Sequence, residues 1–131
     1  MGDYCKGYNF MKSKKETKEI TLKLNYFKSK VDKENGTFIG GVAEPKYLEE
    51  LSIDISDDYN FDIETEEFNK NGMYALEIVG SKRALKEFGK FLINMAMYKT
   101  NDEDYHEHID DIHNSKGDSI ANIAIRKNNK T

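Results

Sequence analysis

Hydrophobic and polar residues alternate in several short segments of this chain, and such alternation predicts β-strands with one buried face. The first segment covers 20–26, where apolar residues occupy every second position. A second strand is expected over 37–42, after a turn at Asn35-Gly36, because Asn-Gly is favoured where φ is positive. The sole proline, Pro45, then interrupts the chain, and one helical turn is expected over 47–51.

Two further alternating segments, 51–55 and 59–63, are predicted to pair as a hairpin. Apolar residues must face the same side across the pair, so a three-residue loop over 56–58 is favoured, with Ile55 opposite Tyr59. The other three-residue loop would place two aspartates opposite each other, which destabilises a strand pair. The hairpin is therefore expected to turn within 56–58.

The clearest element of the second half is a long amphipathic helix over about 81–99. Ser81 is a favourable N-cap, and apolar residues follow at a spacing of 3.6 on one face. These residues are Ala84, Leu85, Phe88, Phe91, Leu92, Met95 and Ala96. An Asn71-Gly72 turn and a more buried strand over 74–79 precede the helix. Two strands, over 105–110 and 119–127, are expected after it.

Together these elements predict an α+β fold, a mostly antiparallel β-sheet with one long helix packed across it. Residues 1–131 are expected to form a single domain, because the length suits one hydrophobic core and no linker or repeat interrupts the pattern. Residues 1–19 follow no period and are expected to be loosely ordered, and 128–131 to be a tail.

Charge and cysteine content exclude several classes of function. The net charge is −4, and arginine occurs only at Arg83 and Arg126. Nucleic-acid recognition relies on basic surfaces and on arginine, so no nucleic-acid partner is expected. Cys5 is the only cysteine, which excludes an internal disulfide. The first residues contain no apolar signal region, and no apolar segment approaches the about 20 residues of a membrane span. We therefore expect a cytoplasmic protein with no membrane partner.

Catalytic residues are hard to find in this chain. Cys5 has no adjacent histidine or cationic cluster that would activate it, and no serine stands in a nucleophile motif. We therefore expect no enzyme activity and no cofactor. One segment could bind a metal ion, because a strand would place His106, His108 and Asp110 on one face. Polar residues on a solvated edge strand explain the same pattern, and this explanation is favoured because His-x-His without a fixed third and fourth ligand is a weak metal signal.

Carboxylates concentrate in the middle of the chain. Residues 44–68 contain ten acids and a single lysine. A charge block can be a solvated face, or it can be a docking surface whose potential complements a basic partner. The candidate partner-binding residues are Asp54, Asp57, Asp58, Asp62, Glu64, Glu66 and Glu67.

Two apolar residues, Ile93 and Met97, fall on the polar side of the predicted helix. They lie one turn apart among lysines. They could form a contact seam for a partner or a second copy. Alternatively, the N-terminus could cover them within the monomer, and this alternative is favoured because the N-terminus contains apolar side chains that need burial. Those side chains are Tyr4, Tyr8, Phe10 and Met11.

The order of elements from residue 74 onward is similar to that of a known family. A strand over 74–80 leads into a helix opened by Ser81-Lys82-Arg83-Ala84-Leu85, followed by His106-Glu107-His108-Ile109-Asp110 and a closing strand over 120–126. This pattern resembles a family of small α+β immunity proteins encoded beside bacterial polymorphic toxins. The resemblance implies a non-enzymatic cytoplasmic protein that occludes a toxin.

Two hypotheses about function follow from these observations. In the first, the chain is an immunity or antitoxin-type protein that binds a cognate toxin with a basic surface through its acidic block. In the second, it is a metal-binding or metal-stabilised small domain that uses the segment from His106 to Asp110.

Overall fold

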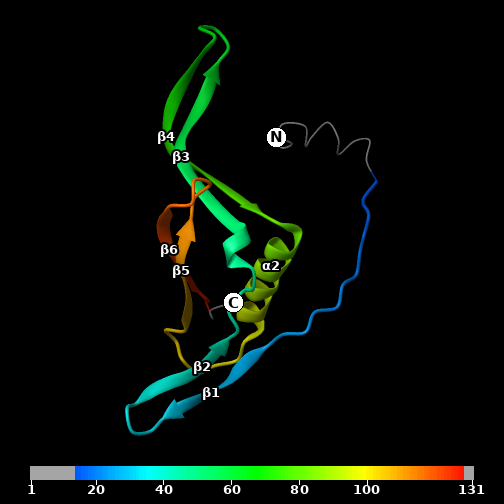
Figure 1. Ribbon diagram of the computed structural model, residues 1–131, viewed down its shortest axis with the longest axis vertical. Coiled ribbons are helices and arrows are strands. Elements are labelled where there is room, and N and C mark those ends of the chain that lie inside the picture. Colours follow the sequence, from blue (N-terminus) through cyan, green and yellow to red (C-terminus); the bar gives the residue numbers. More distant parts are fainter. Residues whose placement is uncertain (1–13, 129–131) are drawn as a thin grey trace.

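The computed structural model describes residues 14–128, which form three antiparallel strand pairs, one long helix and one short 3-10 helix (Figure 1). Strands β1 (Tyr26–Asp32) and β2 (Thr37–Val42) form a separate two-stranded sheet. The main sheet has the strand order β4-β3-β5-β6, and only the β3–β5 pair is parallel. Its strands are β3 (Leu51–Asp62), β4 (Glu67–Gly80), β5 (His106–His113) and β6 (Ser119–Arg126). Helix α2 (Lys82–Met97) packs against this sheet, and the predicted α+β class is confirmed.

The core lies between α2, the inner part of β3 and the β5–β6 pair. Its buried apolar residues come from both halves of the chain, so neither half could form this core alone. They are Val42, Ile53, Phe91, Met95, Tyr98, Tyr105, Ile109 and Ile112, with Leu48, Phe88, Ile123 and Ile125 packed around them. A bulge at Asp111, whose φ is 57°, lets both Ile109 and Ile112 face this core.

Helix α2 begins where the sequence predicts. Ser81 is the N-cap, and its Oγ accepts a hydrogen bond from the Ala84 amide at 3.1 Å. The helix ends at Met97, two residues before the expected Lys99, because Tyr98 takes an extended conformation. The predicted apolar stripe is buried only in part, since Leu85 and Leu92 remain exposed at the margin of the sheet.

The predicted hairpin with a loop over 56–58 is wrong. Residues 51–62 form one continuous strand, β3, which pairs with β4 from Leu51↔Gly80 to Asp62↔Glu67. The chain turns over 63–66 instead. The apolar residues of both segments occupy odd positions, so one unbroken strand places them on one face as well as a hairpin does.

The expected Asn71-Gly72 turn is also wrong, because both residues lie within β4. Asp57 pairs with Tyr74 while Tyr59 pairs with Lys70, so β4 carries extra residues there and forms a bulge. Gly72 has a φ of 80°, a conformation that glycine adopts readily. The same conformational preference that predicts a turn therefore also accommodates a bulge.

The first predicted strand is displaced along the chain. Residues 14–25 form neither helix nor strand, and β1 begins at Tyr26, opposite Val42 at the end of β2. The described residues before Tyr26 have no opposing strand, so they form no strand pair despite their alternating pattern. The turn at Asn35-Gly36, strand 37–42 and a helical turn, the 3-10 helix η2 (Leu48–Glu50), are confirmed.

The β1–β2 hairpin is held to the body by polar contacts. The Tyr98 hydroxyl donates to the Phe27 carbonyl at 2.7 Å, and the Asn94 side-chain amide donates to the Asn25 carbonyl at 2.7 Å. Glu107 Oε2 accepts from the Val42 amide at 3.1 Å and from the Tyr105 hydroxyl at 2.7 Å. Burial, and then the hydrogen bond to Glu107, raise the pKa of Tyr105 well above its usual range.

The start of α2 is fastened to η2 by Glu50. Its carboxylate accepts from the Arg83 Nε at 2.9 Å and also binds Arg83 Nη2 and the Ser81 hydroxyl. The Arg83 guanidinium lies 4.1 Å from the centre of the Tyr47 ring. The Arg83 and Ser81 hydrogen bonds lower the pKa of Glu50 to about 2.

This contact predicts a pH dependence. A carboxyl whose pKa is lowered on folding stabilises the fold above its unfolded pKa and loses that contribution as pH falls through its folded pKa. Glu50→Gln should therefore be less stable than the wild type at pH 6, and the difference should shrink steadily between about pH 5 and pH 2. Urea unfolding across this range measures the difference, with Glu44→Gln as an exposed control. A difference that does not change with pH would contradict the role of Glu50.

Candidate functional site

The outer part of the β3–β4 hairpin projects from the body of the protein (Figure 1). Strand β5 pairs with β3 only at Ser52↔His113. Beyond this point the β5–β6 loop makes one further contact, since Ser115 donates from its amide and hydroxyl to Asp54 Oδ1 at 3.1 and 3.0 Å. From residue 55 of β3 outward, β3 and β4 pair only with each other. We call residues 55–76 the arm.

The arm has two chemically different faces, because residues directly opposite in an antiparallel pair lie on the same side. The side shared with the core contains the pairs Ile55↔Leu76, Asp57↔Tyr74, Tyr59↔Lys70 and Phe61↔Phe68. The other side contains Asn60↔Asn69 and Asp62↔Glu67. The arm is therefore amphipathic, with one face that is apolar apart from the Asp57–Lys70 ion pair and one polar, acidic face.

The apolar face of the arm is exposed to solvent. Phe61 and Phe68 stack with ring centres 5.0 Å apart, yet they remain 51% and 70% exposed. Tyr74 is 76% exposed, and Ile63 in the turn is 81% exposed. The alternation over 59–63 and 74–79 predicted buried strands, and the structure corrects this expectation. Nothing in the part of the chain that the structure describes covers this face.

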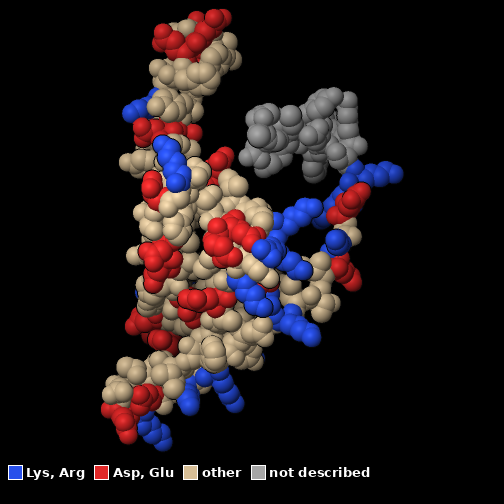
Figure 2. Space-filling model, viewed as in Figure 1, with Lys and Arg blue, Asp and Glu red and all other residues tan. Residues whose placement is uncertain are grey.

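All seven candidate partner-binding acids lie on β3, β4 or the turn between them, so the structure brings the predicted set together along one element. Figure 2 shows acidic side chains gathered at the end of the arm. The turn over 63–66 contains Glu64 and Glu66, and Glu67 begins β4. These three side chains are exposed, and among the described residues they have no ion-pair partner.

The other four acids of the set have partners within the chain. Asp62 Oδ1 accepts from the Glu64 amide at 2.9 Å and so closes the turn. Asp58 accepts from the Asn71 side chain at 2.7 Å, next to the bulge. Asp57 forms an ion pair with Lys70 at 3.0 Å, and Asp54 holds the β5–β6 loop. Asp57, Asp58 and Asp62 shape the arm, and Asp54 fixes the loop at its base. Glu64, Glu66 and Glu67, which we call the turn acids, are the ones available to a partner.

The histidine segment lies on β5, away from the arm. His106 and His108 pack edge to face with ring centres 4.7 Å apart, and His106 Nδ1 lies 2.7 Å from the Asp104 carbonyl oxygen. Within residues 14–128 no three His, Cys, Asp or Glu side chains come together in a way that could hold a metal ion. The hypothesis that uses His106, His108 and Asp110 gains no support from this geometry.

Sequence reasoning missed the importance of Glu107, which lies between the two histidines. Its side chain points to the core side and joins β2 to β5, as described above. The signal was present in the alternation, because a strand that turns its histidines outward must turn Glu107 inward beside Tyr105 and Ile109.

The second predicted contact surface, Ile93 and Met97, is exposed on α2. Ile93 is 42% and Met97 64% exposed. Met97 lines a hollow of about 460 Å³ together with Leu24 and Tyr26. The apolar N-terminal residues that were expected to cover this spot lie within 1–13, outside the described residues. The choice between a seam and an internal cover therefore stays a prediction.

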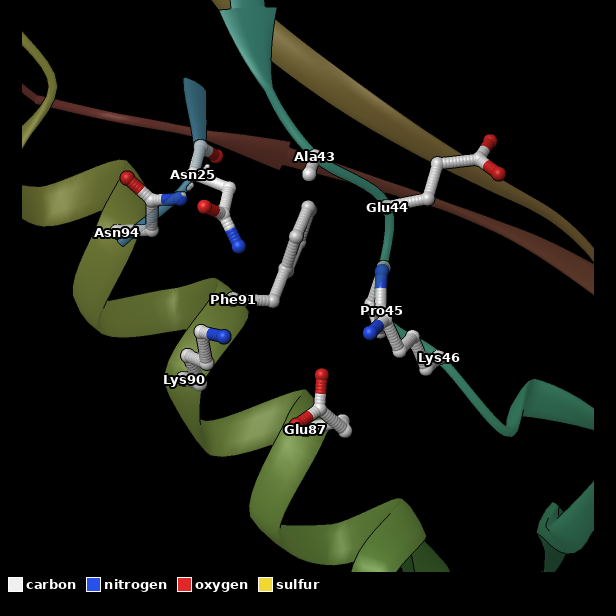
Figure 3. A pocket seen from close by; sticks show the side chains of 9 residues that line it. All are labelled: Asn25, Ala43, Glu44, Pro45, Lys46, Glu87, Lys90, Phe91 and Asn94. Atoms are coloured by element: carbon white, nitrogen blue, oxygen red, sulfur yellow. Dashed lines mark hydrogen bonds between the residues drawn. The ribbon is translucent and has the colours of Figure 1, made fainter. Parts of the chain in front are cut away.

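The site next to α2 in Figure 3 is too small for a substrate. Phe91 and Asn94 of α2 and Asn25, Ala43 and Pro45 of the facing segments line a cavity of about 30 Å³. This volume holds about one or two water molecules, whereas small-molecule sites measure about 300–1,000 Å³. The cavity therefore offers no room for catalysis.

Both arginines are used within the chain. Arg83 binds Glu50, and Arg126 donates to the Asp104 carbonyl at 3.0 Å. No helix in the described part of the chain is long and apolar enough to cross a membrane.

Comparison with known proteins bears on the segment that follows the arm. No curated protein and no solved structure matches the chain. The resemblance expected over 74–126 is confirmed: residues 75–127, which run from the inner part of β4 through α2 to the end of β6, match the model of the family described as Immunity protein 32.

Proposed function

We propose that this chain is an immunity protein that binds a cognate bacterial toxin and occludes it, with the acidic end of the arm as its contact surface. The observation that carries this proposal is the gathering of the predicted acids on one projecting hairpin, joined to a segment that matches an immunity family. The matched residues supply the helix and most of the body, and most of the arm lies outside them. We infer that the body is the shared scaffold and the arm sets which toxin is recognised.

The mechanism is steric and electrostatic. A toxin that cuts nucleic acid has a basic cleft, and carboxylates can occupy the positions where phosphates would bind. Complementary charge speeds the encounter and excludes partners of the wrong sign. No bond is made or broken, which agrees with the non-enzymatic role that the family match implies. Neutralisation would take place in the cytoplasm of the cell that makes the toxin.

The first experiment tests the function itself. The toxin candidate is the product of a gene directly beside the gene for this chain, expressed in a host with and without this protein. We expect cells that express the toxin to grow only when this protein is also expressed. The two proteins should also form a stable complex on size-exclusion chromatography. Absence of rescue together with absence of binding would overturn the proposed function.

The second experiment tests the acidic surface. Glu64→Lys/Glu67→Lys should slow association with the toxin about tenfold or more at low salt and flatten its salt dependence, because steering by exposed charge is screened by ions. Glu34→Lys/Glu103→Lys makes the same change in net charge at exposed positions outside the arm and should leave the rate within about twofold. Equal slowing by both variants would show that net charge alone, and not the arm, steers the encounter.

A further inference from the structure

Few contacts from the described residues hold the arm in place. Beyond Asp54 it consists of two strands only, and at about 3.3 Å per residue the β3 part from 55 to 62 extends about 25 Å. An isolated two-stranded hairpin is only marginally stable in water. A hairpin of this length therefore gains by packing one of its faces on another surface.

The face that offers this packing continues directly from the core. Ile53 is buried in the core, and Ile55↔Leu76 and Phe61↔Phe68, further out on the same side of the sheet, are exposed. Asp57 and Lys70, which form an ion pair, lie on this side between them. The apolar strip thus begins inside the protein and runs outward along the arm, with the Asp57–Lys70 ion pair between its inner and outer parts. Exposed aromatic side chains of this kind are the usual anchors of protein interfaces.

Charged side chains lie around this strip and, at the Asp57–Lys70 ion pair, within it. Six carboxylates and one lysine lie within 55–76. The lysine, Lys70, is already paired with Asp57 at 3.0 Å. An occupant of the strip must therefore present apolar surface opposite the aromatic residues and positive charge around it. A second copy of this chain, docked arm to arm, would bring two acidic tips together, and like charges oppose that arrangement.

We propose that the apolar face of the arm, formed by Ile55, Tyr59, Phe61, Phe68, Tyr74 and Leu76, anchors the protein in an apolar groove of the toxin that is rimmed by basic residues. This inference rests on the proposed function and adds a division of roles to it. The turn acids set the rate of encounter, and the aromatic face sets how long the complex lasts. The bulge at Asn71-Gly72, fixed by Asn71 on Asp58, bends the arm between its inner and outer apolar residues.

The test separates these roles by kinetics. Phe61→Thr/Phe68→Thr removes the aromatic pair but keeps residues with high strand propensity. We expect its dissociation from the toxin to be about 10- to 100-fold faster than that of the wild type, with an association rate within about threefold. Asn69→Thr, next to Phe68 but on the opposite face, is the control and should dissociate at the wild-type rate.

A second variant tests whether faster dissociation reflects the lost aromatic contact or unfolding of the hairpin. Tyr74→Thr lies on the same face but outside the stacked phenylalanine pair, and it should also speed dissociation about tenfold. Melting temperatures of all variants should stay within about two degrees of the wild type, because these residues are exposed and outside the core.

Three outcomes would overturn the inference. In the first, both aromatic variants dissociate at the wild-type rate from a toxin that the wild type binds, which leaves the proposed function intact. In the second, sedimentation shows a dimer of this chain that Phe61→Thr/Phe68→Thr breaks without changing toxin binding, which assigns the face to a second copy. In the third, the wild type binds no toxin, and the proposed function fails as well.

Discussion

Replacing Ile109 by alanine should lower the free energy of unfolding by about 2–5 kcal/mol. Ile109 is 2% exposed and packs in the core between α2 and the β5–β6 pair. Removing its branched side chain leaves a cavity that close-packed neighbours fill only in part. Chemical denaturation measures the loss, which is a large fraction of the stability of a domain of this size.

The matched control for this prediction is Ile63→Ala in the turn of the arm. Ile63 is 81% exposed, so the same deletion should change stability by less than about 0.5 kcal/mol. Ile109→Ala should reduce toxin binding only in proportion to the protein that has unfolded. Similar stability losses at both positions would contradict the placement of the core.

Replacing Gly40 by alanine should cost about 3 kcal/mol or more, because strain and steric overlap add at this position. Its φ is 123°, a conformation that side-chain-bearing residues rarely adopt. An added Cβ would lie 2.8 Å from the Phe27 carbonyl oxygen and 2.9 Å from the Lys28 carbonyl oxygen. These are backbone atoms of β1, so the β1–β2 hairpin would have to open to relieve the contact.

Gly36→Ala separates the cost of backbone strain at positive φ from the cost of steric overlap by the added Cβ. Gly36 also has a positive φ, 67°, but an added Cβ would meet no atom within 4 Å. Its cost should therefore stay near 1 kcal/mol, the expense of the left-handed conformation alone. Limited proteolysis adds a structural measurement, since only Gly40→Ala should expose 26–42 to cleavage. Equal stability losses in the two variants would show that the β1–β2 hairpin does not depend on close contact at Gly40.

Local patterns in the sequence predicted the elements whose signals are confined to neighbouring residues. The N-cap at Ser81, the helix that follows it, the turn at Asn35-Gly36 and the strand over 37–42 all depend on contacts within a few positions, so they were read correctly. The resemblance over 74–126 also depends on such an ordered series of elements, and it is confirmed by the match over 75–127. The acidic set was identified as well, because charge is visible residue by residue.

Pairing partners and burial could not be obtained in this way. Alternation over 51–63 states which residues share a face, but one long strand and a short hairpin satisfy it equally. The long strand forms because β4 pairs with β3 along its whole length. Alternation also does not state what covers an apolar face. It predicted that Tyr59 and Phe61 would be buried, whereas the body of the protein ends before it reaches them.

The sequence by itself therefore determined the fold class, the helix and its cap, and the presence of an acidic region, because each of these depends on local chemistry. Only the tertiary structure decided that the acids lie on a projecting arm, that Glu107 and not the adjacent histidines joins the two sheets, and that no residue within 14–128 covers the aromatic face. These features arise where segments distant in the sequence meet, or fail to meet, and packing between such segments is not encoded by any short stretch of residues.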